Sequence, residues 1–198
     1  AVVAKKGKRG TVAATVKLVR RDGGVECERK ATIEYLGALG RAVIKVAEDA
    51  WVGKSIPDAN RGDTPNLLVD GGDRQMGDRS HHITYLKFPL AIPGKVTKAT
   101  LRLYNAGNPT GHSGRVCLLA EPWSEKKITY SNRPKPGTEL VRIGPVKSKQ
   151  VVELTLNPAV LEGKKELSLV IDPINCDGVD YIAREAGKPA ELVVEYQR

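Results

Sequence analysis

A repeat of two in the hydrophobic residues is the strongest pattern in this sequence. In ATLRLY (residues 99–104), leucines alternate with Arg102 and Tyr104. Because successive side chains of a strand point to opposite faces of a sheet, this pattern predicts strands with one buried face. The same alternation recurs in three later segments: VVELTL (151–156), ELSLVI (166–171) and ELVVEY (191–196).

Clusters of glycine, proline, asparagine and aspartate separate these segments. They include AGNPTGHSG (106–114), RPKPG (133–137) and DPINCDG (172–178). Helix signals are scarce, and the best is NPAVLEG (157–163), where an asparagine cap followed by proline predicts one or two turns. Many short strands with such turns between them predict an all-β antiparallel sandwich or barrel.

The first forty residues form a separate pattern. TVAATVKLVR and RKATIEYL flank the dipeptide Asp22-Gly23, which is typical of a hairpin turn. LGALG (36–40) follows as a short flexible break. We therefore expect residues 1–40 to form a small β hairpin, or the tail of a preceding β domain, and residues 41–198 to form the main domain.

The charge of the chain favours polyanionic partners. Its net charge is +9 and its pI is about 9.5, which suits nucleic acid, anionic polysaccharide or an acidic surface. The basic segment AKKGKRG (4–10) is not accompanied by a known nucleic-acid-binding motif, which argues against nucleic acid. No run approaches the roughly 20 apolar residues that a membrane span requires.

The three cysteines leave the redox compartment open. Cys27, Cys117 and Cys176 lack the spacing of zinc ligands. One disulfide with one free thiol, or three free thiols, would both fit the sequence.

Five segments, in order along the chain, resemble the DNRLRE domain family. This family is a class of carbohydrate-binding module attached to secreted polysaccharide-degrading enzymes and surface proteins. Two departures are Pro89, where the family commonly has aspartate, and Ala183, which replaces a serine. The matching segments are EDAWV (48–52), DANRG with NLLV (58–69), TYLKFPL with IPGKVTKATLRLY (84–104), WSEKKITYSNRP (123–134) and YIAREAGKPAELVVEY (181–196).

The resemblance implies a jelly-roll β-sandwich that binds polysaccharides, acidic ones among them, and has no catalytic activity. It also implies a secreted or cell-surface location and neighbouring enzyme or surface domains in a parent protein. Joined to the positive charge, it predicts an acidic ligand such as a polyuronate or a sulfated glycan. An immunoglobulin-like sandwich is the alternative fold, but the Cys–Trp–Cys core pattern is absent.

Catalytic motifs are missing from the sequence. There is no GxSxG nucleophile elbow, and the 23 acidic residues do not single out a glycosidase pair. We therefore expect no catalytic residues. The alternative to sugar binding is a structural spacer or adhesion domain without a sugar site, which the small number of aromatic residues favours.

The predicted sugar site is one face of a sheet. If Leu86 and Phe88 point inward, Tyr85 and Lys87 point outward, and the next strand turns Arg102 and Tyr104 outward. Consecutive strands usually neighbour one another, so the two strands would place two aromatic rings and two cations on one face. The alternatives are that other strands or residues 1–40 cover this face, or that a loop binds the ligand instead. The charged residues of that loop are Arg74, Arg79, His81 and His82.

Two further expectations concern Trp123 and a metal ion. Trp123 is predicted to pack at a corner of the sandwich, with a stacking platform for sugar as the alternative. Asp49, Asn60 and the loop DGGDRQMGD (70–78) supply the oxygen atoms that calcium prefers, without the spacing of an EF-hand. The chain is expected to require no cofactor, and a structural calcium ion is the one candidate.

Overall fold

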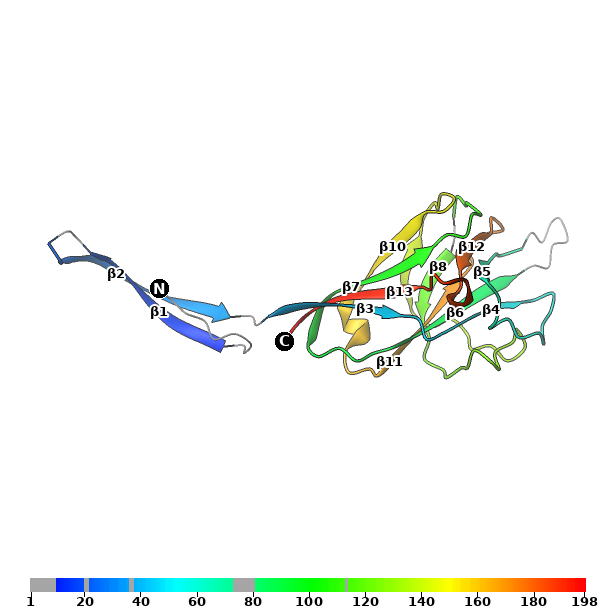
Figure 1. The fold of residues 1–198 in the computed structure, drawn as a ribbon, viewed down its shortest axis with the longest axis horizontal. Coiled ribbons are helices and arrows are strands. Elements are labelled where there is room, and N and C mark those ends of the chain that lie inside the picture. The colour runs from blue at the N-terminus through cyan, green and yellow to red at the C-terminus, as the bar shows by residue number, and fades with distance from the viewer. Residues whose placement is uncertain (1–9, 20–21, 36–37, 73–80, 113) are drawn as a thin grey trace.

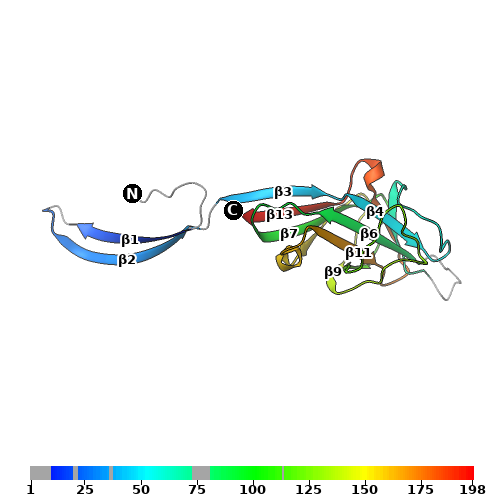
Figure 2. The same cartoon turned by 90° about the horizontal axis from the view of Figure 1, so that it is seen from below.

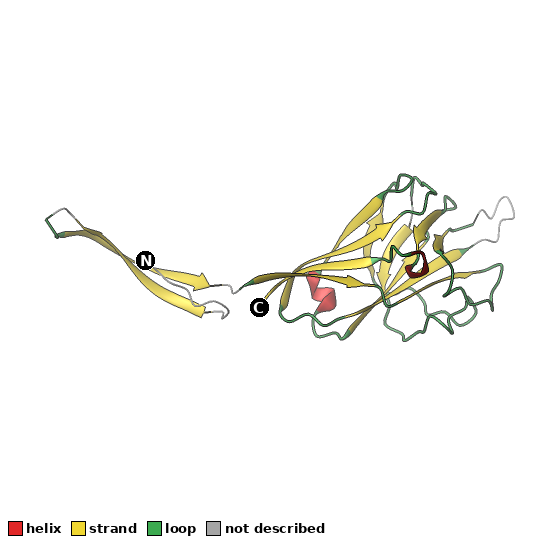
Figure 3. Cartoon of the chain, viewed as in Figure 1, coloured by secondary structure: helices red, strands yellow, loops and turns green. Residues whose placement is uncertain are grey.

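The computed structural model describes residues 10–19, 22–35, 38–72, 81–112 and 114–198. In this part of the chain, strands make up almost all of the regular structure (Figure 3). The two helices there are short 3₁₀ turns, η1 (Pro158–Leu161) and η2 (Arg184–Ala186). Asn157 caps η1 by accepting a hydrogen bond from the backbone N–H of Ala159, which confirms the predicted short helix.

The first two strands form the predicted hairpin. β1 (Gly10–Val19) pairs antiparallel with β2 (Val25–Tyr35). At the turn, Gly23 has a φ of 87°, and the Asp22 carboxylate accepts the N–H of Gly24. Both views place this hairpin beyond the end of the sandwich where β3 begins (Figures 1 and 2).

The remaining strands form two main sheets and one small one. The four-stranded sheet has the order β10-β7-β13-β3, and the five-stranded sheet has the order β4-β6-β11-β8-β9. A short sheet joins β12 to β5. The bounds are β3 (Leu39–Lys45), β4 (Glu48–Gly53), β5 (Asn66–Val69), β6 (His82–Pro89), β7 (Lys95–Tyr104), β8 (Gly114–Leu118), β9 (Glu139–Ile143), β10 (Val151–Leu156), β11 (Glu166–Asp172), β12 (Val179–Ile182) and β13 (Glu191–Gln197).

The pairing of these strands is that of a jelly roll. The antiparallel pairs β3–β13, β6–β11, β7–β10 and β8–β9 are nested along the chain. Successive pairs alternate between the four-stranded and the five-stranded sheet, as in a hairpin rolled into two layers. β4 is an additional strand at the edge, beside β6. The predicted all-β sandwich is thus confirmed.

The main core lies between the two large sheets. It contains the inward-facing residues that the alternation predicted, since Leu101 and Leu103 of β7 are at most 1% exposed. Burial of such side chains stabilises the fold by about 1.5–3 kcal/mol each. Other members of this core are Leu86, Phe88, Val152, Leu154, Leu156, Leu167, Leu169, Ile171, Leu192, Val194 and Tyr196.

The prediction that β6 and β7 are neighbours is wrong. β6 belongs to the five-stranded sheet and β7 to the four-stranded sheet. Residues 90–94 carry the chain from one sheet to the other, with Gly94 close to the backbone carbonyl of Gln197. In a jelly roll, consecutive strands often cross between sheets, so the rule that they pair does not apply here.

A long loop packs on the outer face of the five-stranded sheet. We call residues 119–138, which connect β8 to β9, the corner loop. Its side chains form a second core with outward-facing residues of the sheet, separate from the first. The members from the loop are Leu119, Trp123 and Ile128, and those from the sheet are Ala50, Val52, Ile83, Tyr85, Cys117 and Val170.

In the residues that the structure covers, no helix has the length and hydrophobicity needed to span a membrane. Cys117 is buried, Cys176 is exposed, and both are free thiols. The side chain of Cys27 lies outside the described part of the chain.

Candidate functional site

Trp123 is the centre of the corner loop's contact with the sheet. It is 9% exposed, and its ring centroid lies 5.7 Å from that of Tyr85. The indole Nε1 donates to the Ser168 hydroxyl at 3.3 Å. The interpretation of Trp123 as a packing residue with a partner for its N–H is confirmed.

Tyr85 and Lys87 do point to the outer face of their sheet, but the corner loop covers both. Tyr85 is fully buried, its hydroxyl donates to the carbonyl of Pro134, and burial raises the pKa of Tyr85. Lys87 is 8% exposed. Its Nζ donates to Glu48 at 3.0 Å and to the Trp123 carbonyl at 2.6 Å. Neither side chain is open to a polysaccharide in this structure.

Arg102 and Tyr104 lie on the outer face of the other large sheet. The Arg102 guanidinium donates to Glu153 and Glu191, and these bonds raise the pKa of Arg102. Tyr104 donates its hydroxyl to Glu191 at 3.0 Å. The four predicted sugar-binding residues therefore lie on two different sheets and do not form one face.

The corner loop itself contains a pocket of about 340 Å³. Its volume lies at the lower end of the range for ligand pockets, and its walls combine apolar surface with a few polar groups, as such sites usually do. The lining residues are Pro122, Trp123, Ser124, Lys127, Ile128, Asn132 and Pro134.

The corner loop carries four cations, of which Lys127 lines the pocket. Lys127 is exposed and forms no ion pair with a described residue. Arg133 stacks over the Tyr130 ring, with 3.5 Å between its Cζ and the ring centroid, and donates to the Tyr130 carbonyl. Lys126 and Lys135 are further exposed cations of the same loop. The sequence analysis missed this site because it treated the whole segment as a structural corner, although the cations are visible in KK and RPKP.

The alternative loop site is only partly described. Arg74 and Arg79 lie outside the described residues. His82 packs edge-on against Trp51, with 4.9 Å between ring centroids. His81 contacts the corner loop, because its Nδ1 lies 2.9 Å from the Tyr130 hydroxyl.

His81 is expected to make the free energy of unfolding depend on pH. Burial lowers the pKa of His81, the Asp172 carboxylate opposes this, and three nearby cationic or titratable groups, Arg133, Lys54 and His82, lower it further. In the unfolded chain a histidine titrates at about 6.5. The neutral ring therefore contributes stability above pH 6.5 that is lost as the pH falls through the lower folded-state value.

We expect His81→Asn to reduce this loss, because asparagine can accept the Tyr130 hydrogen bond but cannot be protonated. Urea unfolding at pH 7.5, 6.5 and 5.5 measures the difference. If the slope of unfolding free energy against pH is the same in the variant and the original chain, His81 does not contribute to the pH dependence of stability.

The two predicted metal-binding residues both contact Glu125. Asn60 donates its amide to the carbonyls of Glu125 and Ile128 at 2.6 and 2.8 Å, and its oxygen accepts the N–H of Gly62. These bonds hold the corner loop in place, and they use both the amide nitrogen and the oxygen of the Asn60 side chain. Asp49 is 1% exposed, and its backbone N–H donates to Glu125 at 3.0 Å.

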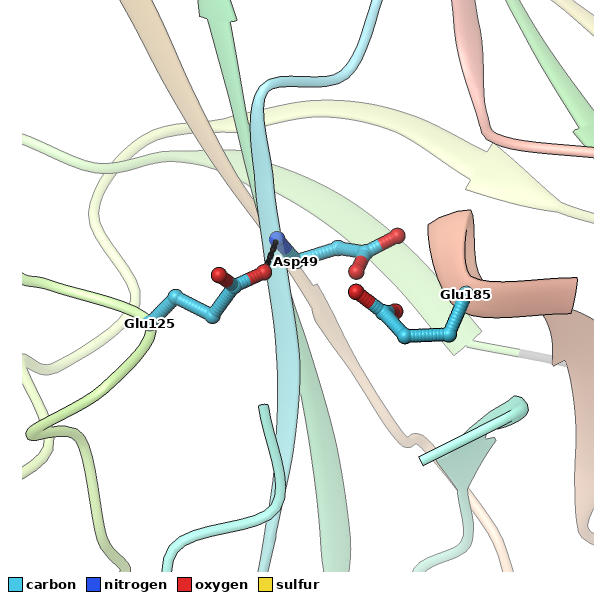
Figure 4. Close-up of side chains that lie close together, drawn as sticks. All are labelled: Asp49, Glu125 and Glu185. Carbon is cyan, nitrogen blue, oxygen red and sulfur yellow. Dashed lines mark hydrogen bonds between the residues drawn. The ribbon is translucent and has the colours of Figure 1, made fainter. Parts of the chain in front are cut away.

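Asp49 belongs to a cluster of three carboxylates (Figure 4). One oxygen each of Asp49, Glu125 and Glu185 lie within 4.8 Å of one another. Arg184 donates to Glu125 at 2.8 and 2.9 Å and lies 2.8 Å from Glu185. Burial raises the pKa of Asp49 to about 6; the Arg184 N–H lowers it, and the neighbouring charges of Glu185 and Glu125 raise it.

One comparison with known proteins identifies a family. The model described as carbohydrate-binding module family 96 matches residues 41–196. A search among curated proteins found no match to the chain. The matched range runs from β3 into β13, so it includes both large sheets, the corner loop and the carboxylate cluster.

Proposed function

The chain belongs to carbohydrate-binding module family 96, and from this premise we propose that residues 41–198 bind an acidic polysaccharide at the corner-loop pocket. In this proposal the module is not an enzyme and serves a larger secreted enzyme or surface protein. Residues 1–40 then form a separate hairpin before it. The observation that carries the proposal is a pocket with apolar walls beside an exposed lysine, Lys127, that pairs with no acidic group of the described residues.

The burial of aromatic rings favours a charged ligand. Among the aromatic side chains of the described residues after position 38, none is fully exposed; Tyr104 and Tyr130 are half-buried and the others are buried. A flat platform of rings, on which a neutral polysaccharide could stack, is thus not found among these residues. Binding would rest on charge and hydrogen bonds, with apolar contact limited to the pocket walls.

The distribution of charge favours the corner loop over the rest of the module. Residues 1–40 carry nine lysines and arginines against four acidic residues, so residues 41–198 carry 23 against 19 and a net charge of +4. Four of these cations lie in one ten-residue stretch of the corner loop, residues 126–135: Lys126, Lys127, Arg133 and Lys135. Its acidic residues are Glu121 and Glu125, and Arg184 already neutralises Glu125.

A uronate residue would fit this pocket in one orientation. The C–H face of the sugar ring would lie against Pro122, Trp123 and Ile128, and its carboxylate would point to the Lys127 ammonium. Arg133, which Tyr130 holds in place, would contact the next acidic group along the chain. A sulfate group would meet the same cations.

We expect the module to bind polygalacturonate more tightly than a neutral glucan, with an affinity that falls as salt screens the exposed charges. Lys127→Ala should weaken polyuronate binding by about three- to tenfold and flatten the salt dependence. Isothermal titration calorimetry at two salt concentrations measures both effects.

Two control variants locate the site. Lys98→Ala removes the same charge from the four-stranded sheet, where Lys98 pairs with Glu195, and should leave the affinity unchanged. Arg102→Ala tests the sheet face that the sequence predicted. If Arg102→Ala weakens binding and Lys127→Ala does not, the corner-loop site is wrong and the four-stranded sheet binds the ligand.

A second candidate function is a spacer or adhesion domain without a sugar site. The same lack of fully exposed rings in the described residues favours it. A glycan array that includes neutral, uronate and sulfated polysaccharides separates the two functions. Absence of binding to all of them would reject the sugar-binding proposal and support the spacer.

A further inference from the structure

One carboxylate oxygen in the sandwich is buried without a partner among the residues that the structure describes. Asp49 is 1% exposed, its Oδ2 accepts the backbone N–H of Arg184 at 2.9 Å, and its Oδ1 meets no hydrogen-bond donor from those residues. Burying an unpaired acceptor of this kind costs free energy, so such atoms usually meet water, a proton or a cation. Figure 4 shows that the Asp49 carboxylate faces the Glu185 carboxylate.

The surroundings of this oxygen carry an excess of negative charge. The three carboxylates Asp49, Glu125 and Glu185 are in contact with one described cation, Arg184, which leaves a charge of −2 in a chain whose net charge is +9. A divalent cation would neutralise this excess.

The spacing of the carboxylates suits calcium. Ca²⁺ binds oxygen at about 2.3–2.6 Å, so two ligands on opposite sides of the ion lie at most about 5 Å apart. One oxygen of each of the three carboxylates meets this limit, because they lie within 4.8 Å of one another. Three protein ligands leave room for water to complete the six to eight positions that Ca²⁺ takes.

The cluster is also accessible from solvent. Glu125 and Glu185 line a cavity of about 340 Å³, together with Asn60, Gly62, Asp63, Lys126 and Arg184. The Arg184 side chain is 39% exposed, so it can move toward solvent. Each carboxylate would then have a free lone pair with which to bind an ion. An ion can therefore reach Glu125 and Glu185 from this cavity, and a shift of Arg184 would open the way to the buried Asp49.

We propose that Asp49, Glu125 and Glu185 form a calcium site. The three ligands come from β4, the corner loop and η2, which are far apart in the sequence. Bound Ca²⁺ would tie the corner loop to the edge of the five-stranded sheet, where Glu125 already accepts the Asp49 N–H. Because Glu125 lies two residues from both Trp123 and Lys127, the ion would also hold the pocket in place; this last step rests on the proposed function.

The first experiment uses no sugar. The full chain is freed of metal with EDTA and titrated with Ca²⁺ by calorimetry, and its thermal unfolding is recorded at 10 mM Ca²⁺ and at matched ionic strength in NaCl. We expect a dissociation constant of about 0.1–1 mM and a rise of about 3–8 °C in the unfolding midpoint. Mg²⁺ should bind more weakly, because it requires shorter bonds and stricter octahedral geometry.

Variants test the ligands. Asp49→Asn keeps an acceptor for the Arg184 N–H, and Glu185→Gln changes an exposed side chain, so both should fold; each should weaken Ca²⁺ binding at least tenfold. Glu121→Gln, an exposed acid of the corner loop outside the cluster, should bind Ca²⁺ as the original chain does. No heat and no midpoint shift in the original chain, or full affinity in Glu185→Gln, would overturn the site. In that case a water molecule or a proton would satisfy the Asp49 oxygen instead.

The sugar enters only in a second step. Polygalacturonate affinity is measured for the original chain and for Asp49→Asn, each with Ca²⁺ and with EDTA. We expect Ca²⁺ to raise the affinity of the original chain severalfold and to leave the variant unchanged. Calcium binding without any polysaccharide binding would refute the proposed function and leave the metal site intact.

Discussion

Replacing Trp123 by alanine is expected to lower the free energy of unfolding by about 3–5 kcal/mol. The indole is almost buried and packs on Tyr85 and Ile128 in the second core. Removing it leaves a cavity between the corner loop and the five-stranded sheet, and it leaves the Ser168 hydroxyl without the indole N–H. Urea unfolding followed by circular dichroism measures the change.

The control for this prediction is Trp123→Phe, which keeps an aromatic ring and should lose roughly half as much. A different result would show a different role. If Trp123→Ala unfolds at the same urea concentration as the original chain and loses only its affinity for sugar, Trp123 is a stacking platform and not a packing residue.

Replacing Lys87 by methionine is expected to cost about 2–3 kcal/mol of unfolding free energy. The change keeps the volume but removes the donor to the Trp123 carbonyl and the partner of Glu48. Leaving a buried acceptor or a buried charge without its partner costs about 1–5 kcal/mol. The Glu48 side chain is 33% exposed, and solvent there reduces the electrostatic part of the loss.

Lys98→Met is the matched control, because Lys98 is exposed on the four-stranded sheet. It should change the unfolding free energy by less than about 0.5 kcal/mol. Equal, small effects of both substitutions would contradict the buried role of Lys87. If Lys87→Met loses sugar affinity but keeps the unfolding free energy of the original chain, Lys87 is a binding residue, as the sequence predicted.

The alternation of hydrophobic residues was sufficient to predict β6, β7, β10, β11 and β13 and their buried faces. Leu101, Leu103 and Phe88 are all in the core, because a period of two leaves little choice of face. It could not predict which strands pair. That depends on how the hairpin pairs roll into two sheets, and the crossing between β6 and β7 at residues 90–94 has no sequence signal of its own.

The same limit explains the outcome for the predicted sites. The alternation correctly predicted that Tyr85 and Lys87 point away from the main core. It does not show that a loop thirty-odd residues later covers them. Asp49 was singled out because it begins a strand among oxygen-rich loops. Glu125 and Glu185 were missed as its neighbours, because 76 and 136 residues of chain separate them from it.

The pairing of β3 with β13 has a mechanical consequence. Leu39 at the start of β3 lies opposite Gln197 at the end of β13, so the chain enters and leaves the sandwich side by side. A force that pulls these two ends apart acts across the strands and loads one backbone hydrogen bond at a time, as in opening a zipper. A force along the strands would load all of them together. The sandwich therefore opens easily under tension through this pair, a geometry better suited to a side-mounted module than to a link that transmits force.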